Sequence, residues 1–176
     1  GVTINEIQNV YRLPASLQRD WAARSYHGSE EHNSRAVINR YLGYWDGNPA
    51  TLVPASPRDS APLYVEMMGG SAKILARSRE LHAAGDYRLA IELLNKLVFA
   101  QPSNQAARNQ LADAFEQMGY QKESSSLRNS FLAAALELRS GIPSGLMPRS
   151  ASPDTVRAMT TELWLDYLGI LLDSRK

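Results

Sequence analysis

Apolar side chains recur every three or four positions along most of this chain, the spacing that places them on one face of an α-helix. The pattern begins in residues 3–11, where Thr3 and Glu6 have the spacing of a capping box at a helix start. A second helix is predicted within residues 13–26. Strict alternation of apolar and polar residues, which indicates a β-strand, never extends beyond a few residues. We therefore predict an all-α fold.

The third predicted helix starts at Ser29, a residue type favoured at helix N-caps, and ends at Gly47, because Pro49 cannot continue it. Residues 46–62 contain four prolines and are predicted to form a loop. The segment APLYVEMM then forms a short helix that a pair of glycines ends. We expect the apolar side chains of the second and third helices to lie mostly in a helical core: Leu17, Trp21, Tyr26, Val37, Ile38, Tyr41, Leu42 and Trp45.

The strongest periodicity runs from Ser71, the predicted N-cap of the next helix, to about residue 138, and it contains an internal repeat. Gly85 and Gly119 lie in corresponding predicted turns 34 residues apart (119 − 85), which is the length of a tetratricopeptide repeat. Such a repeat is a pair of antiparallel helices that cross closely, with small residues at the contact. In the first copy we expect five residues to make this contact or to fill the space around it: Ser78, Leu81, Ala90, Leu94 and Leu97.

The second copy matches the repeat less well. Its first helix follows the pattern, with Phe115 predicted in the core, but Ser124 stands where alanine is usual and the segment ESSSLRNS is unusually polar. We predict an antiparallel helical array with two tetratricopeptide-like helix pairs within residues 71–138. Two such pairs cannot bury their own flanks, so the leading helices or another subunit must cover one side.

The last part of the chain is predicted to be separate from this array. Residues 141–153 are rich in glycine, proline and serine and are predicted to form a linker. Residues 154–176 are predicted to form one amphipathic helix with a wide apolar face. Because the chain begins at Gly1 close to one helical pattern and stops in another, we expect it to be an excerpt of a longer protein. The apolar face of the last helix comprises Val156, Met159, Leu163, Trp164, Tyr167, Leu168 and Leu171.

The composition excludes several classes of function. The chain is 44% hydrophobic and 21% charged, which is ordinary for a globular protein. Its net charge of +1, without clusters of Lys or Arg among the aromatic residues, argues against a nucleic-acid partner. No apolar run is long enough to predict a membrane span. The absence of cysteine excludes disulfides, thiolate metal ligands and a cysteine nucleophile.

The histidines are the main candidates for chemistry. His27 and His32 are separated by about 140° around a helix, so a single helix would not direct both at one metal ion. We expect no metal site within the chain, and we expect His82 to lie on the surface. His32 lies off the apolar face beside Asn33 and near a helix start, where an imidazole can donate to an anion; simple helix capping is the alternative. The sequence contains no complete catalytic apparatus.

Residues 25–52, SYHGSEEHNSRAVINRYLGYWDGNPATL, are followed by YVEMMGG and by the repeat-bearing helices. In this order and spacing, the segments resemble the dimerisation domain of the alkyl sulfatases built on a metallo-β-lactamase fold. The resemblance covers about residues 1–140. Residues 154–176 are similar to the opening helix of the sterol-carrier-like C-terminal domain of that family.

The resemblance implies that the chain is a fragment of an enzyme that hydrolyses alkyl sulfate esters to alcohol and sulfate. Two zinc ions would lie in an upstream metallo-β-lactamase-like domain, and none would lie in this chain. The chain itself would form a homodimer and close the active-site pocket. Members of the family are often exported, so a periplasmic or secreted location is expected.

The resemblance also implies which residues bind the substrate. Tyr26, His32 and Asn33 match the family's pocket-facing motif, and His27 is the fourth candidate for substrate binding. His27 and Ile38 stand where the family often has tyrosine, so the polarity of the pocket is expected to differ. The alternative function is a free-standing tetratricopeptide-like interaction scaffold without catalysis. A small helical enzyme complete in itself is a third hypothesis, against which the lack of paired carboxylates counts.

Overall fold

The computed structural model describes residues 2–143 and 153–171 of the chain. Every regular element within these residues is a helix, which confirms the all-α fold predicted from the spacing of apolar side chains. The chain divides into two compact units, Gly1–Gly141 and Ile142–Lys176. No helix in the described part of the chain has both the length and the apolar character needed to cross a membrane.

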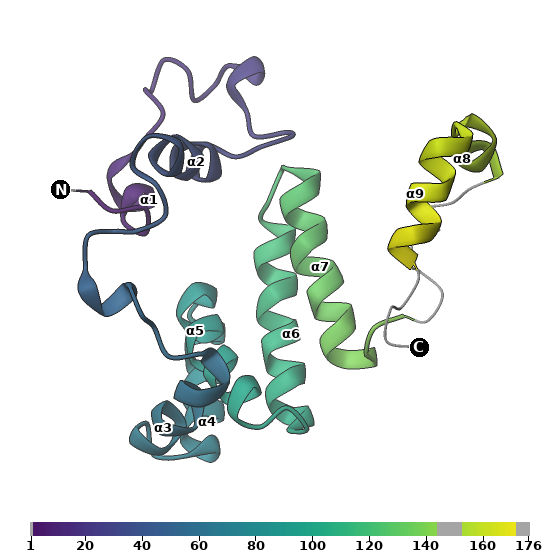
Figure 1. The fold of residues 1–176 in the computed structure, drawn as a ribbon. Coiled ribbons are helices and arrows are strands. Elements are labelled where there is room, and N and C mark those ends of the chain that lie inside the picture. The colour runs from purple at the N-terminus through teal and green to yellow at the C-terminus, as the bar shows by residue number, and fades with distance from the viewer. Residues whose placement is uncertain (1, 144–152, 172–176) are drawn as a thin grey trace. The chain divides into compact units, whose positions relative to one another are not determined.

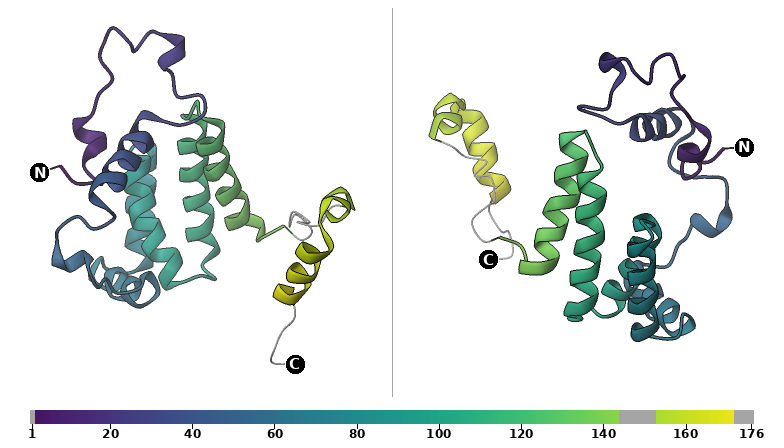
Figure 2. Two further views of the ribbon diagram at one scale, coloured as in Figure 1. Left: turned by 45° about the horizontal axis from the view of Figure 1, so that its top comes forward. Right: turned by 180° about the vertical axis from the view of Figure 1, so that it is seen from behind.

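Four helices form the centre of the first unit: α4 (Ser71–Ala83), α5 (Tyr87–Ala100), α6 (Gln105–Tyr120) and α7 (Ser125–Ser140). Each packs against the next one in the sequence, and α6 and α7 lie side by side in all views of Figures 1 and 2. The chain reverses between α4 and α5 at Gly85, whose φ of 82° lies in the left-handed region that favours glycine.

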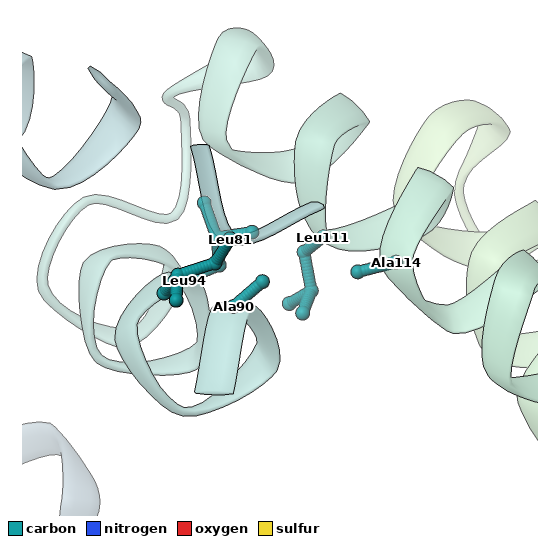
Figure 3. Packing of buried hydrophobic residues seen from close by; sticks show 5 residues of the cluster. All are labelled: Leu81, Ala90, Leu94, Leu111 and Ala114. Atoms are coloured by element: carbon teal, nitrogen blue, oxygen red, sulfur yellow. The ribbon is translucent and has the colours of Figure 1, made fainter. Parts of the chain in front are cut away.

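The core of the first unit lies between these helices. The five residues predicted to pack the first helix pair are all buried, and Figure 3 shows three of them with Leu111 and Ala114 of α6. Ser71 was predicted to be the N-cap of α4, but the N-cap is Gly70 and Ser71 is the first helical residue. The helix pairs are therefore present, while their likeness to tetratricopeptide repeats stays a prediction.

Helix α3 (Pro57–Met67) starts within the residues that were predicted to form a loop. Ser56 caps it, accepting a hydrogen bond from the N–H of Asp59 at 3.2 Å. Pro57 is favourable directly after this cap, because the first helical residue needs no N–H donor. Pro57 thus starts a helix and Pro62 lies inside it, so the prediction of a loop to residue 62 is wrong.

The N-terminal arm, which we define as residues 2–54, differs most from prediction. Helix α1 is short (Ile7–Val10), and the segment predicted as a second α-helix contains only a short 3-10 helix, Trp21–Ala23. The carboxylate of Asp20 accepts a hydrogen bond from the N–H of Ala22 at 2.9 Å. Such local side-chain contacts compete with a longer α-helix.

Helix α2 (Glu30–Leu42) begins after Ser29, as predicted, but it ends at Gly43 instead of Gly47. None of its side chains is buried, and Tyr41 is 82% exposed. The prediction that this face lies in the core is therefore wrong for the chain alone, because helical spacing shows which residues share a face but not what covers it. The exposed residues of that prediction are Leu17, Trp21, Tyr26, Val37, Tyr41, Leu42 and Trp45.

The second unit contains α8 (Pro153–Ala158) and α9 (Thr161–Leu171) in place of the single predicted helix. The break has a local cause, since the hydroxyl of Thr160 accepts the N–H of Leu163 at 3.2 Å and so starts a new helix. Most of the predicted linker, residues 144–152, lies outside the described residues, as do residues 172–176.

Candidate functional site

The first turn of α2 fixes the position of His32. Ser29 is the N-cap and accepts a hydrogen bond from the backbone N–H of His32 at 3.2 Å. The same Oγ lies 2.8 Å from the ring atom Nδ1 of His32. The side chain of His32 is exposed, so the other ring nitrogen, Nε2, is the atom that can meet a ligand. Ser29, and not His32, therefore supplies the cap.

The segment before α2 lies against the start of α7. Ser124 donates a hydrogen bond from its Oγ to the carbonyl of His27 at 2.6 Å, and the N–H of Ser125 donates to the carbonyl of Tyr26 at 3.4 Å. We call these two hydrogen bonds the tether. Next to them, Arg24 forms an ion pair with Glu123. The tether thus joins two stretches of chain that are 97 residues apart.

Two of the four predicted substrate-binding residues share a pocket. His27 and His32 line an open pocket of about 260 Å³ together with serines of α7 and the residues before it. Asn33 lines a different pocket of about 600 Å³, and Tyr26 lines neither of the two. The structure therefore brings the two histidines together, while Tyr26 and Asn33 lie around them on the same segment.

Tyr26 and Asn33 each have a neighbour that sets their position. The guanidinium carbon of Arg24 lies 5.8 Å from the centre of the exposed Tyr26 ring, which is within the range of a cation–π interaction. Asn33 lies beside Gly28, where a Cβ atom would come within 2.8 Å of Oδ1 of Asn33. Any larger residue at position 28 would therefore displace the Asn33 amide.

Helix α2 is joined to α5 by charge. The carboxylate of Glu31 accepts a hydrogen bond from Arg88 at 2.8 Å, and Arg35 lies 3.3 Å away. Partial burial raises the pKa of Glu31, but the hydrogen bond and charge of Arg88, with the charges of Arg35 and Lys122, outweigh it and lower the pKa overall. Glu31 is therefore ionised at neutral pH and holds the arm through its ion pairs.

The chemistry available at this edge is hydrogen bonding. An imidazole, a carboxamide and a phenol lie on residues 26–33, and each can donate a hydrogen bond. Within residues 2–143 and 153–171, no three His, Asp or Glu side chains are grouped so that they could hold a metal ion. His82 is partly exposed and meets Tyr87 edge-on, 5.0 Å between ring centres.

Sequence reasoning missed the part that Ser124 plays in this site. The polar segment ESSSLRNS was the available signal, because it departs from the repeat pattern where small apolar residues are usual. The partner of Ser124 could not be read from that signal, since the contact with His27 is a long-range one.

The fold and the site define a helical domain that presents hydrogen-bond donors at one edge. The family model for "Alkyl sulfatase dimerisation" matches residues 3–141. The chain belongs to this family.

Curated relatives extend the comparison to the whole chain. A linear primary-alkylsulfatase of Pseudomonas sp is 46% identical over 98% of this chain, and an (R)-specific secondary-alkylsulfatase of Pseudomonas sp is 45% identical over 100% of it. An alkyl/aryl-sulfatase of Saccharomyces cerevisiae is 39% identical over 100% of the chain. The chain corresponds to 26%, 26% and 27% of the lengths of these relatives, about a quarter of each.

Solved structures give the same family. The stereoselective inverting sec-alkylsulfatase Pisa1 from Pseudomonas sp. superposes with a TM-score of 0.77, at 46% identity over 88% of this chain and 26% of its own. A double mutant of the same enzyme reaches a TM-score of 0.80, at 44% identity over 98% of this chain and 27% of its own.

Proposed function

We propose that this chain is the dimerisation part of an alkyl sulfatase that hydrolyses alkyl sulfate esters to the alcohol and sulfate. The observation that carries the proposal is the match of the dimerisation family to residues 3–141, together with 46% identity to a linear primary-alkylsulfatase. The comparisons do not favour the free-standing scaffold. A periplasmic or secreted location, and a sterol-carrier-like domain that begins near residue 154, remain part of the same proposal.

The proposed division of labour assigns the bond-breaking chemistry to another part of the enzyme. By family resemblance, an upstream metallo-β-lactamase-like domain binds two zinc ions, which supply activated water. The described residues of this chain offer no group of ligands for those ions. We therefore expect the isolated chain to bind no zinc stoichiometrically and to hydrolyse no sulfate ester.

The contribution of this chain to the site is to bind and orient the ester. With the hydroxyl of Ser29 donating to Nδ1 of His32, Nε2 carries the ring proton and donates a hydrogen bond to a sulfate oxygen or to the leaving oxygen. Tyr26, His27 and Asn33 lie on the same short segment and can complete the polar side of the pocket. A contact that strengthens as the ester bond breaks lowers the barrier and therefore raises kcat.

The dimerising role has a candidate surface in the N-terminal arm. Its apolar side chains are exposed in the single chain, and burying each large one against a second copy contributes about 1.5–3 kcal/mol. A second copy is the occupant that the family's dimerising role implies. The large apolar residues of this surface are Val37, Tyr41, Leu42, Tyr44, Leu52 and Val53.

The test is made on the full-length protein that contains this chain. We expect release of inorganic sulfate from a medium-chain alkyl sulfate, loss of that activity on removal of metal, and a dimer by light scattering. A zinc-loaded full-length protein that releases no sulfate from primary or secondary alkyl sulfates would refute the proposed reaction. A monomer that is fully active would refute the dimerising role alone.

A further inference from the structure

The tether joins the candidate site to a helix that contributes none of the predicted substrate-binding residues. Ser124 precedes α7, and its hydroxyl donates to the carbonyl of His27 at 2.6 Å. Its neighbour Ser125 donates from the backbone to the carbonyl of Tyr26, and Glu123 pairs with Arg24. Three consecutive residues thus contact the segment that leads into α2, which is more than a chance contact of one side chain.

Ser124 is buried, and its hydroxyl makes two hydrogen bonds. It is only 3% exposed, and Ser78 is the other buried polar side chain among the described residues. Its oxygen accepts the N–H of Leu127 at 3.5 Å and so caps α7, while its proton is donated to His27. A hydroxyl can do both, since it carries one donor and two acceptor sites.

We propose that Ser124 is a positioning residue for the substrate-binding edge, and this inference rests on the proposed sulfatase function. By holding the carbonyl of His27, it fixes the backbone of residues 26–29, and Ser29 in turn orients His32. The hydroxyl of Ser124 is engaged by the His27 carbonyl and the Leu127 N–H, so we assign it no contact of its own with the ester. It acts through the geometry of the residues that bind the ester.

Substitutions at this position separate the tether from the helix cap. Ser124→Ala removes both. Ser124→Asp keeps a good N-cap, but an ionised carboxylate only accepts hydrogen bonds and cannot donate to the His27 carbonyl. Ser124→Thr keeps both functions. Asn104→Ala is the matched control, because Asn104 caps α6 by accepting the N–H of Ala107 at 3.1 Å and has no part in the tether.

The experiment measures steady-state kinetics, melting temperature and amide hydrogen exchange of residues 26–29 in the full-length enzyme. We expect Ser124→Ala and Ser124→Asp to lower kcat/KM by about 10- to 100-fold, mainly in kcat, as misplaced groups do. Exchange of these amides should become faster. Ser124→Thr should stay within a few-fold of wild type, and Asn104→Ala should lower only the melting temperature.

Three results would overturn the inference. Wild-type kinetics in Ser124→Ala would mean that Ser124 is a cap only, and normal kinetics in Ser124→Asp alone would assign the effect to the cap. A slow Ser124→Thr enzyme of normal melting temperature would show that the donated hydrogen bond is not what matters. Failure of the proposed function is distinguishable, because then the wild-type enzyme itself would release no sulfate.

Discussion

His32 is held at two of its atoms by one neighbour. The backbone N–H and the ring Nδ1 both meet the hydroxyl of Ser29, at 3.2 and 2.8 Å. A ring fixed in this way loses little freedom when it binds. When the hydroxyl of Ser29 donates to Nδ1, the ring proton lies on Nε2, which can then donate. This arrangement gives an exposed histidine a definite orientation without burying it.

We predict that His32→Ala in the full-length enzyme lowers kcat/KM by about 30- to 1000-fold, corresponding to a transition-state contact of ~2–4 kcal/mol. The melting temperature should change little, because the side chain is exposed. Steady-state kinetics with a medium-chain alkyl sulfate and thermal unfolding are measured together. Unchanged kinetics would remove His32 from the site, and a variant that cannot fold would make it a structural residue.

Core residues of α6 provide the contrasting prediction. Leu111 is 2% exposed, so Leu111→Ala should lower the free energy of unfolding by about 2–5 kcal/mol through the cavity it leaves. Phe115 was predicted to be a core residue; it is half-buried, packs against the core cluster and lies 5.8 Å from Phe131 between ring centres. Because part of its ring stays exposed, Phe115→Ala should cost less than the ~3–5 kcal/mol of a fully buried Phe. Denaturant unfolding checks both, and a cost above ~3 kcal/mol for Phe115→Ala would contradict its partial burial.

Helices α4 to α7 could be predicted from the sequence because small and large residues alternate along them at a fixed interval. Ser78 and Ala90 mark the close contact, and they are buried as expected. The second predicted helix failed for a local reason, since the carboxylate of Asp20 hydrogen-bonds to the nearby backbone. The spacing of apolar residues does not show where a side chain will compete with the helix for backbone hydrogen bonds.

Only the local contacts of the candidate site could be predicted from the sequence. Ser29 as an N-cap follows from residue type and spacing. The contacts of Ser124 with His27 and of Glu31 with Arg88 join distant segments, 97 and 57 residues apart. No pattern within one segment specifies such a partner, so these contacts required the folded chain.

The ion pairs of Glu31 predict how α2 responds to pH. Because the pKa of Glu31 in the folded chain lies below its unfolded value of 4.5, the ion pairs stabilise the fold above that pH and are lost as the pH falls further. Glu31→Gln should lower the free energy of unfolding by about 0.5–1 kcal/mol at pH 7. The difference from wild type should shrink as the pH falls below 4.5.

Denaturant unfolding across this pH range tests the prediction. Glu80→Gln is the control, since Glu80 pairs with Arg77 at 2.7 Å within a single helix and joins no two elements. Hydrogen exchange of α2 should be faster in Glu31→Gln only. Equal protection of α2 in both variants would show that Glu31 does not hold the arm.

At the scale of the whole molecule, the exposed apolar surface of the arm predicts where two copies meet. Tyr41→Arg should turn the dimer into a monomer at micromolar concentration, because a charge cannot be buried there without a partner. Tyr120→Arg, at another exposed tyrosine, should leave the dimer intact. Light scattering decides, and a Tyr41→Arg protein that remains dimeric would place the interface elsewhere.

The separation of the arm from the core also bears on how such enzymes diversify. All the fully buried side chains among the described residues lie between Ala61 and Ala135, and none lies in the arm. Substitutions in residues 2–54 that spare the tether and the dimer surface therefore leave the core packing untouched. Under the proposed function, substitutions in the arm would change the preference for substrate while selection for folding acts mainly on the rest of the chain. We therefore expect mutational tolerance and changes of substrate preference in the same fifty residues or so.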